Sequence, residues 1–200
     1  MSTNTSRPTR DATWRTVDIV VAAVIAVAFG VVFWAWNQVW AAASPAFIGL
    51  PPLQGLMYGV WLLPGVLGAM VIRKPGAAIF AALVAAIVSA LLGNQWGLTV
   101  IWYGLFQGAA AEGVFLLGRY RSWSLPTAVL AGAASGAAAS VLDLVYYYPE
   151  WSTGWMTTYA VLVSASAAVI AGLGGWLLVR ALAPTGVLSP FRSGREQAPV

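Results

Sequence analysis

The sequence contains no cysteine and no histidine, and it has few charged residues of either sign. Without these two residues it can form no thiolate nucleophile, no disulfide, no Ser–His dyad and no zinc or haem site built on such ligands. Only 8% of its 200 residues are charged, whereas a soluble domain carries roughly 25%. Hydrophobic residues make up 60%, and the mean hydropathy is +0.80. This composition indicates an integral membrane protein.

Several catalytic and regulatory motifs are also missing. We find no G-x-x-x-x-G-K-[ST] phosphate loop, no H-E-x-x-H zinc motif and no pair of intramembrane aspartates suited to an aspartyl protease. There is no arginine ladder of the kind that senses voltage. The sequence therefore predicts a protein that is not an enzyme, needs no cofactor or metal, and carries no motor of its own.

Long uncharged runs predict six transmembrane helices, because a bilayer core about 30 Å thick needs about 20 apolar residues per helix. The run 19–72 is long enough for two helices, and prolines near positions 45 and 51 divide it. The run 75–111 divides at residues 93–97. We predict an all-α bundle with spans at 17–43, 53–72, 76–92, 98–117, 125–147 and 155–181. These form one transmembrane domain (16–182) between polar tails at 1–15 and 183–200.

The positions of lysine and arginine predict the orientation. Basic residues occur before the first span, between the second and third, between the fourth and fifth, and after the last. The positive-inside rule makes these segments cytoplasmic, so both termini are expected inside the cell membrane. Residues 1–11 are polar and precede no cleavage site of the A-x-A type, so we expect no cleaved signal peptide. Although the pI is near 9.8, the basic residues lie between apolar runs, and we expect no nucleic-acid partner.

The expected outer end of the bundle is rich in aromatic, amide and acidic side chains. An interfacial aromatic belt facing lipid is one explanation, but such a belt needs no amides or acids. Aromatic rings with a few convergent polar groups are typical of a pocket for a flat, polar small molecule. Carboxylates and ring faces would also favour a cation. The residues that we expect to bind such a ligand are Gln38, Trp40, Asn94, Gln95, Trp96, Tyr103, Gln107, Glu112, Asp143, Tyr146, Tyr147 and Glu150.

Two of these residues, Glu112 and Asp143, are acids inside predicted spans. A carboxylate in hydrocarbon is costly, so such residues usually face a cavity or a partner. A purely structural hydrogen bond to a neighbouring helix is the alternative. Small residues four apart, Ala22 with Ala26 and Gly132 with Gly136, allow close helix contacts, and internal packing explains them equally well.

Several short stretches of the sequence together form a specific pattern. They are Tyr58-Gly59-Val60-Trp61, Arg73-Lys74-Pro75-Gly76-Ala77-Ala78, Leu91-Leu92-Gly93-Asn94, Gln107-Gly108, Ala111-Glu112, Ser124-Leu125-Pro126 and Asp143. In this pattern, and from about residue 18 to 187, the chain resembles the substrate-binding S components of energy-coupling factor (ECF) vitamin transporters, specifically the YkoE type.

This resemblance implies a six-helix S component that captures thiamine or its hydroxymethylpyrimidine moiety at the outer face. A transmembrane coupling (T) subunit and two ABC ATPase subunits would then drive uptake. The site would lie among the outer loops and the last three helices, and small residues on the first helix (Ala22 and Ala26) would meet the coupling subunit. Three other functions stay open: an S component for a different vitamin, a proton-coupled carrier using Glu112 and Asp143, and a structural assembly protein.

Overall fold

The first uncharged run forms one long helix, α1 (Thr16–Ala43), in a computed structural model that describes residues 13–196. Asp18 caps its first turn, where the carboxylate accepts the backbone N–H of Arg15 at 2.7 Å. Prolines start the two short 3-10 helices that follow, η1 (Ser44–Phe47) and η2 (Pro51–Met57). The predicted first span, 17–43, therefore agrees with α1 to within one residue, and the chain turns where the prolines indicated.

Four further helices complete the first five predicted spans. They are α2 (Gly59–Ile72), which η2 precedes, α3 (Ala77–Leu91), α4 (Thr99–Leu117) and α5 (Leu125–Tyr146). Helix α3 begins after Gly76, whose φ of 85° is a conformation that glycine adopts without strain. Each predicted boundary among these helices lies within two residues of the observed one, when the second span is counted from the start of η2 at residue 51.

The last predicted span is a continuous helical segment with an irregular middle. It consists of α6 (Thr153–Ala167), the π-helical turn η3 (Ala168–Leu173) and α7 (Gly174–Leu182). A π turn widens the helix, and here α5 approaches closely: a Cβ on Gly132 would lie 2.5 Å from the carbonyl oxygen of Ala167. The predicted tail after residue 182 is instead folded, through η4 (Ala183–Thr185) and α8 (Arg192–Arg195). Phe191 is buried there, and the Ser193 hydroxyl donates to the Val71 carbonyl at 2.8 Å.

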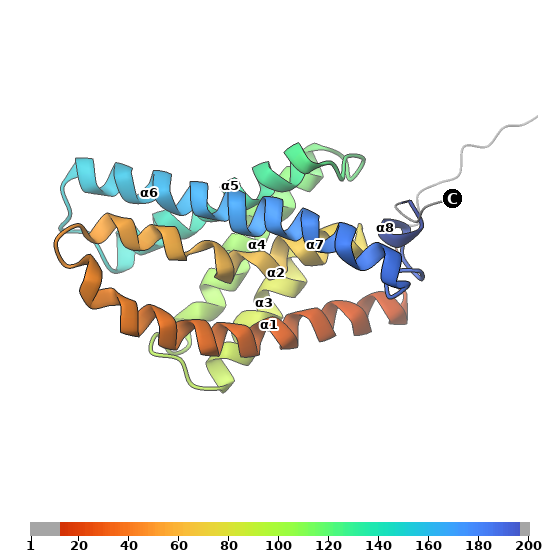
Figure 1. Ribbon diagram of the computed structural model, residues 1–200, viewed down its shortest axis with the longest axis horizontal. Coiled ribbons are helices and arrows are strands. Elements are labelled where there is room, and N and C mark those ends of the chain that lie inside the picture. The colour runs from red at the N-terminus through yellow and green to blue at the C-terminus, as the bar shows by residue number, and fades with distance from the viewer. Residues whose placement is uncertain (1–12, 197–200) are drawn as a thin grey trace, which may run out of the picture.

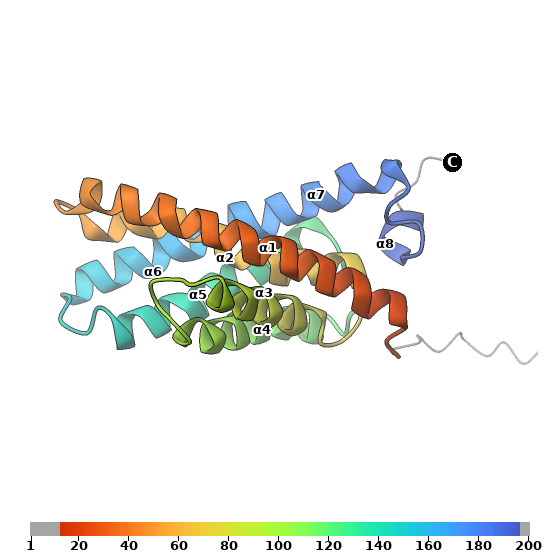
Figure 2. The same ribbon diagram turned by 90° about the horizontal axis from the view of Figure 1, so that it is seen from below.

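The helices pack as an elongated bundle around α2, which is the most buried of the long apolar helices. The start of α1 and the α8 segment lie together at one end of the bundle (Figures 1 and 2). The turn after α1 and the loop between α5 and α6 lie at the opposite end (Figure 1). We call the first the basic end, because Arg15, Arg73, Lys74, Arg119 and Arg121 lie there, and the second the aromatic end.

Five of the helical segments are long and apolar enough to cross a membrane, while α3, with 15 residues, is shorter. The outward face of α1 is apolar, with Val20, Val24, Val27 and Val31 all about half exposed or more. Such a face suits lipid rather than water. The chain is therefore an all-helical, multi-pass membrane protein.

Candidate functional site

A cavity of about 310 Å³ lies between the helices in the half of the bundle toward the aromatic end. It is bounded by the second half of α1 and α3, the beginnings of α2, α4 and α6, and the end of α5. Its walls are mainly aromatic, with a few polar groups. The lining residues are Phe33, Asn37, Trp40, Tyr58, Trp61, Ala82, Ala86, Ser89, Trp96, Thr99, Val100, Tyr103, Gly104, Gln107, Asp143, Tyr147, Tyr148 and Tyr159.

One wall is a cluster of indole rings from three separate segments. The ring centroids of Trp40 on α1 and Trp61 on α2 are 5.0 Å apart, and Trp96, from the loop before α4, lies 5.6 Å from Trp61. Tyr58 completes the cluster at 5.3 Å from Trp61. The rings meet edge to face, the arrangement that their quadrupoles favour. Such a wall offers π faces to a flat or cationic ligand.

The cavity also holds Asp143, the one charged side chain among the lining residues. Its two carboxylate oxygens accept hydrogen bonds from Tyr103 on α4 and Tyr159 on α6, each at 2.7 Å. The side chain is only 5% exposed, and within residues 13–196 it takes part in no ion pair. A carboxylate that two phenols hold in place without a cation is well suited to bind a positively charged ligand.

Amide and hydroxyl groups supply the remaining polarity. The Asn37 side-chain oxygen accepts the indole N–H of Trp61 at 3.0 Å, which fixes both side chains. Gln107 lies one helical turn beyond Tyr103 on α4, and both are buried. Burial and the negative charge of Asp143 raise the pKa of Tyr148 to about 12, so this phenol stays a neutral donor. These groups can bind and orient a ligand.

Six of the residues expected from the sequence line this cavity: Trp40, Trp96, Tyr103, Gln107, Asp143 and Tyr147. Five others from the aromatic end do not, namely Gln38, Asn94, Gln95, Tyr146 and Glu150. Gln38 and Tyr146 are exposed. Gln38 follows the lining residue Asn37 and Tyr146 precedes the lining residue Tyr147, and a helix turns about 100° per residue, so neighbours point in different directions. The Asn94 side-chain oxygen accepts the Trp96 backbone N–H at 2.8 Å, so it shapes the loop that carries Trp96.

The structure corrects the expectation for Glu112, which does not line the cavity. Its carboxylate oxygens accept the backbone N–H groups of Gly76 and Ala78, each at 2.8 Å, and the Tyr120 hydroxyl at the same distance. Glu112 thus caps the amino terminus of α3 near the basic end. Glu112 and Asp143 thus lie on different helices, 31 positions apart, and their side chains are in opposite halves of the bundle.

The structure also corrects the expected partner interface of Ala22 and Ala26. Both are 0% exposed, because this stripe of α1 packs inward. A Cβ on Gly30, further along the same face, would lie 2.5 Å from Val88 on α3. The small residues therefore bring α1 close to α3, which is the internal packing that the sequence left as the alternative.

Twelve lining residues were not among those expected from the sequence. They are Phe33, Asn37, Tyr58, Trp61, Ala82, Ala86, Ser89, Thr99, Val100, Gly104, Tyr148 and Tyr159. Asn37 and Trp40 are three positions apart, as are Tyr58 and Trp61, so helical spacing puts each pair on one face. That spacing could have selected Asn37 over its neighbour Gln38. Nothing in the sequence marked Tyr159, whose role depends on where α6 packs against α5.

Three comparisons with known proteins each match a component of a transport system. The family described as "ABC-type cobalt transport system, permease component" matches residues 17–138. The putative HMP/thiamine permease protein YkoE of Bacillus subtilis (strain 168) is 38% identical over 186 residues, which is 92% of each chain. A crystal structure of an S-component of an ECF transporter matches with a TM-score of 0.87 at 37% identity, over 92% of this chain and 93% of that one. The similarity in sequence and fold thus extends over most of the chain.

Proposed function

The chain belongs to the S components of ECF transporters, and on that basis we propose that it captures thiamine or hydroxymethylpyrimidine at the outer face of the cell membrane. As an S component it is the substrate-binding subunit of a transporter and not an enzyme. The identity of the ligand is suggested by the relative in Bacillus subtilis, which is described as a putative HMP/thiamine permease.

The observation that carries the proposal is that Asp143 and the indole cluster line the same cavity. Thiamine has a thiazolium ring with a permanent positive charge, which a buried carboxylate and the faces of Trp40 and Trp61 would attract. Its aminopyrimidine ring needs donors and acceptors, and Asn37 and Gln107 offer both. The cavity volume of about 310 Å³ is at the lower end of the range of roughly 300–1,000 Å³ for small-molecule pockets.

We further propose six membrane crossings with both termini in the cytoplasm. Helix α3 is only about 22 Å long by its residue count, yet it connects the Arg73–Lys74 turn to the loop that carries Trp96. Its two ends thus face opposite ends of the bundle, as a crossing requires. The basic end then lies inside by the positive-inside rule, and the cavity opens toward the outside.

Transport in this proposal needs partners, because the sequence has no nucleotide-binding motif. A transmembrane coupling (T) subunit and two ABC ATPase subunits would supply the energy for uptake. Since Ala22 and Ala26 are buried, the T subunit would meet other residues. The exposed valines of α1 are available for such a contact.

Calorimetric titration of the detergent-purified protein with thiamine, and separately with hydroxymethylpyrimidine, tests the ligand. Asp143→Asn keeps the shape of the side chain and removes its charge. We expect thiamine affinity to fall at least tenfold, because a hydrogen bond or contact to a charged group contributes about 1.5–3 kcal/mol. Neutral hydroxymethylpyrimidine should lose less.

Glu150→Gln is the matched control, since Glu150 is an exposed acid at the same end that does not line the cavity. It should bind thiamine as the unaltered protein does. The absence of heat with either ligand, from a folded and monodisperse sample, would rule out the thiamine assignment and leave family membership intact. An equal loss of affinity for both ligands in Asp143→Asn would mean that Asp143 does not interact with the positive charge of the thiazolium ring.

A further inference from the structure

A second hollow, of about 360 Å³, lies at the basic end of the bundle. It forms where α1 begins, where α2 ends, at the turn of residues 118–124 after α4, and where the α8 segment folds back. Six arginines and one lysine line it, against the single carboxylate of Glu196. The other cavity has no basic lining residue, so the two hollows have opposite electrostatic character.

Glu196 neutralises only part of this positive charge. It forms ion pairs with Arg73, whose side chain is almost fully buried, and with Arg192 at 3.4 Å. The Arg73 guanidinium also lies 5.7 Å from the centre of the Trp123 ring. Burial among these groups lowers the pKa of Arg73 from its ordinary value, and Glu196 opposes that effect. The contacts with Glu196 and Trp123 hold the Arg73 side chain in place within the hollow.

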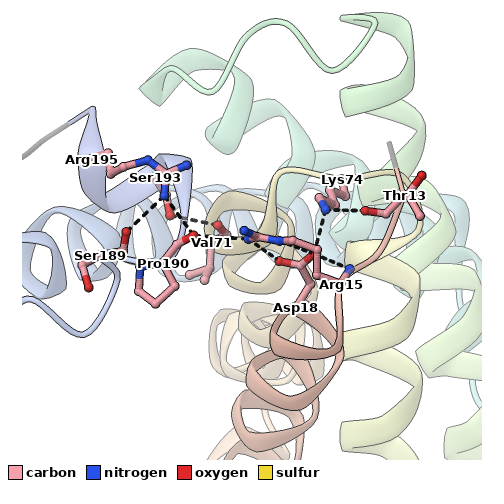
Figure 3. A network of polar contacts seen from close by, with 9 residues as sticks. All are labelled: Thr13, Arg15, Asp18, Val71, Lys74, Ser189, Pro190, Ser193 and Arg195. Carbon is pink, nitrogen blue, oxygen red and sulfur yellow. Dashed lines mark hydrogen bonds and ion pairs between the residues drawn. The ribbon is translucent and has the colours of Figure 1, made fainter. Parts of the chain in front are cut away.

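A second carboxylate, Asp18, forms ion pairs with basic residues on the side of the hollow nearest α1. Its oxygens contact Arg15 at 2.8 Å and Lys74 at 2.7 Å, as Figure 3 shows. The same view shows Arg195 directed toward the carbonyl oxygens of the 189–190 turn. Two carboxylates are therefore shared among four cations, and Arg195 is held by neutral groups.

Arg119 and Arg121 remain without a carboxylate partner. Both are exposed at the rim of the hollow, and neither takes part in an ion pair among the residues that the structure describes. Arginine presents a planar fork of donors that matches the oxygens of a phosphate group. The rim thus offers two guanidinium groups to an anion.

The backbone around the hollow is unusual as well. Arg73, Arg119 and Tyr120 have φ values of 55°, 51° and 52°, and within residues 13–196 they are the non-glycine residues with positive φ. All three line the hollow. The left-handed conformation is unfavourable for residues with a Cβ, and such positions concentrate at functional sites.

The end of α4 shows this most clearly. The backbone N–H of Tyr120 bonds to the Phe115 carbonyl at 2.8 Å, and that of Arg119 to the Leu116 carbonyl at 2.7 Å. Glycine is the usual residue at the left-handed position of such a helix end, but here Gly118 precedes that position and Arg119 occupies it. The chain thus has an arginine at a position where glycine would adopt the left-handed backbone conformation with less strain.

The hollow adjoins the apolar outer surface of the bundle. Leu116 and Leu117, directly before this turn, are 59% and 86% exposed, as expected of side chains among acyl chains. Basic pockets at this level of membrane helices bind lipid headgroups. We propose that the hollow binds a phosphate group, carried by an anionic lipid headgroup or by a soluble phosphate compound, with Arg119 and Arg121 as its principal donors.

Native mass spectrometry of the delipidated, detergent-purified protein tests this proposal. The protein is titrated with phosphatidylglycerol and, separately, with inorganic pyrophosphate. Arg119→Gly removes one charge and suits the left-handed backbone, so a loss of binding cannot be attributed to misfolding. Arg121→Gln is the second variant. Arg180→Gln is the control, because Arg180 stacks on Trp176 outside the hollow.

We expect Arg119→Gly and Arg121→Gln each to weaken binding about fivefold, the equivalent of about 1 kcal/mol per basic residue near an anionic surface. Arg180→Gln should bind normally. A loss confined to phosphatidylglycerol identifies the lipid as the source, and a loss for both probes identifies the phosphate group itself. Unchanged binding in both rim variants, or an equal loss in Arg180→Gln, would overturn the proposal. The proposal would also be overturned if Arg119→Gly or Arg121→Gln bound both probes normally but no longer associated with a T subunit. The rim of the hollow would then be a contact surface for that protein.

Discussion

The carboxylate of Glu112 on α4 accepts the backbone N–H of Ala78 in the first turn of α3, with 2.8 Å between nitrogen and oxygen. Its other oxygen accepts the N–H of Gly76. The first N–H groups of a helix have no partner within the helix, and a negative charge there also interacts favourably with the helix dipole. An acid that would be costly in hydrocarbon therefore stabilises the contact between two neighbouring helices.

Glu112→Gln should lower stability and leave ligand binding unchanged. The amide keeps one acceptor oxygen, loses the charge and presents an NH₂ group to a backbone N–H, at a cost of roughly 1–3 kcal/mol. Thermal unfolding in detergent should show a lower Tm, and calorimetry should show normal thiamine affinity. A variant with normal Tm and weakened binding would return Glu112 to the ligand site.

Glu112 illustrates how far the sequence could predict the fold. Uncharged runs and prolines were sufficient to locate the long apolar helices, because these features reflect the hydrocarbon thickness and the cost of charge in lipid. The same reasoning marked Glu112 as unusual. It could not identify its partner, since the turn at Gly76 is 36 positions away and meets α4 only in the packed bundle. The fold of the segment 183–196 was missed because its few apolar residues show no helical period.

Replacing Ala22 by leucine should destabilise the bundle. Ala22 is 0% exposed on the inward stripe of α1, and added volume in a packed interior costs about 1–3 kcal/mol. Val24→Leu is the matched control, because Val24 is 61% exposed on the outward face. Tm and yield of the purified protein should fall only for Ala22→Leu. If Ala22→Leu folded normally and instead failed to associate with a T subunit, the original interface prediction would stand.

Gly132 on α5 and Gly113 on α4 allow a second comparison of a packed position with an open one. A Cβ at Gly132 on α5 would lie 2.5 Å from the Ala167 carbonyl oxygen and 2.9 Å from the backbone nitrogen of Gly172, neither of which is a flexible side chain. Gly132→Ala should therefore lower Tm by forcing α5 away from the π turn. Gly113→Ala places its Cβ in open space within α4. It should leave Tm unchanged or raise it slightly, since alanine favours a helix more than glycine does. Equal Tm values for the two variants would contradict the close packing of α5.

The candidate site was predicted less completely than the fold. Residue type was informative, because tryptophan, tyrosine and an aspartate on helices at one end of a membrane bundle favour a pocket. The direction in which each side chain points could not be predicted in the same way. Asn37 and Gln38 differ by one position, and only Asn37 faces inward. The helical period resolves such neighbours only when the buried face is known. Asn94 and Glu150 lie on loops, where no period applies.

Thiamine should quench the tryptophan fluorescence of the protein, and Trp96→Phe should reduce this quenching. Trp96 lines the cavity and is the loop member of the indole cluster, 6.4 Å from Trp40 and 5.6 Å from Trp61 between ring centroids. Phenylalanine keeps an aromatic face but attracts a cation less strongly than tryptophan, so affinity should fall about two- to fivefold, which corresponds to roughly 0.5–1 kcal/mol.

Trp102→Phe provides the comparison for this measurement. Trp102 lies on the same helix that follows the Trp96 loop, is 61% exposed and does not line the cavity. Its replacement removes one fluorophore from the lipid-facing surface, so total emission should fall while the fraction quenched by thiamine rises or stays constant. Quenching that disappears in Trp102→Phe and persists in Trp96→Phe would place the ligand on the outside of the bundle. In that case the aromatic residues at this end would act as an interfacial belt and the cavity between the helices would not be the binding site.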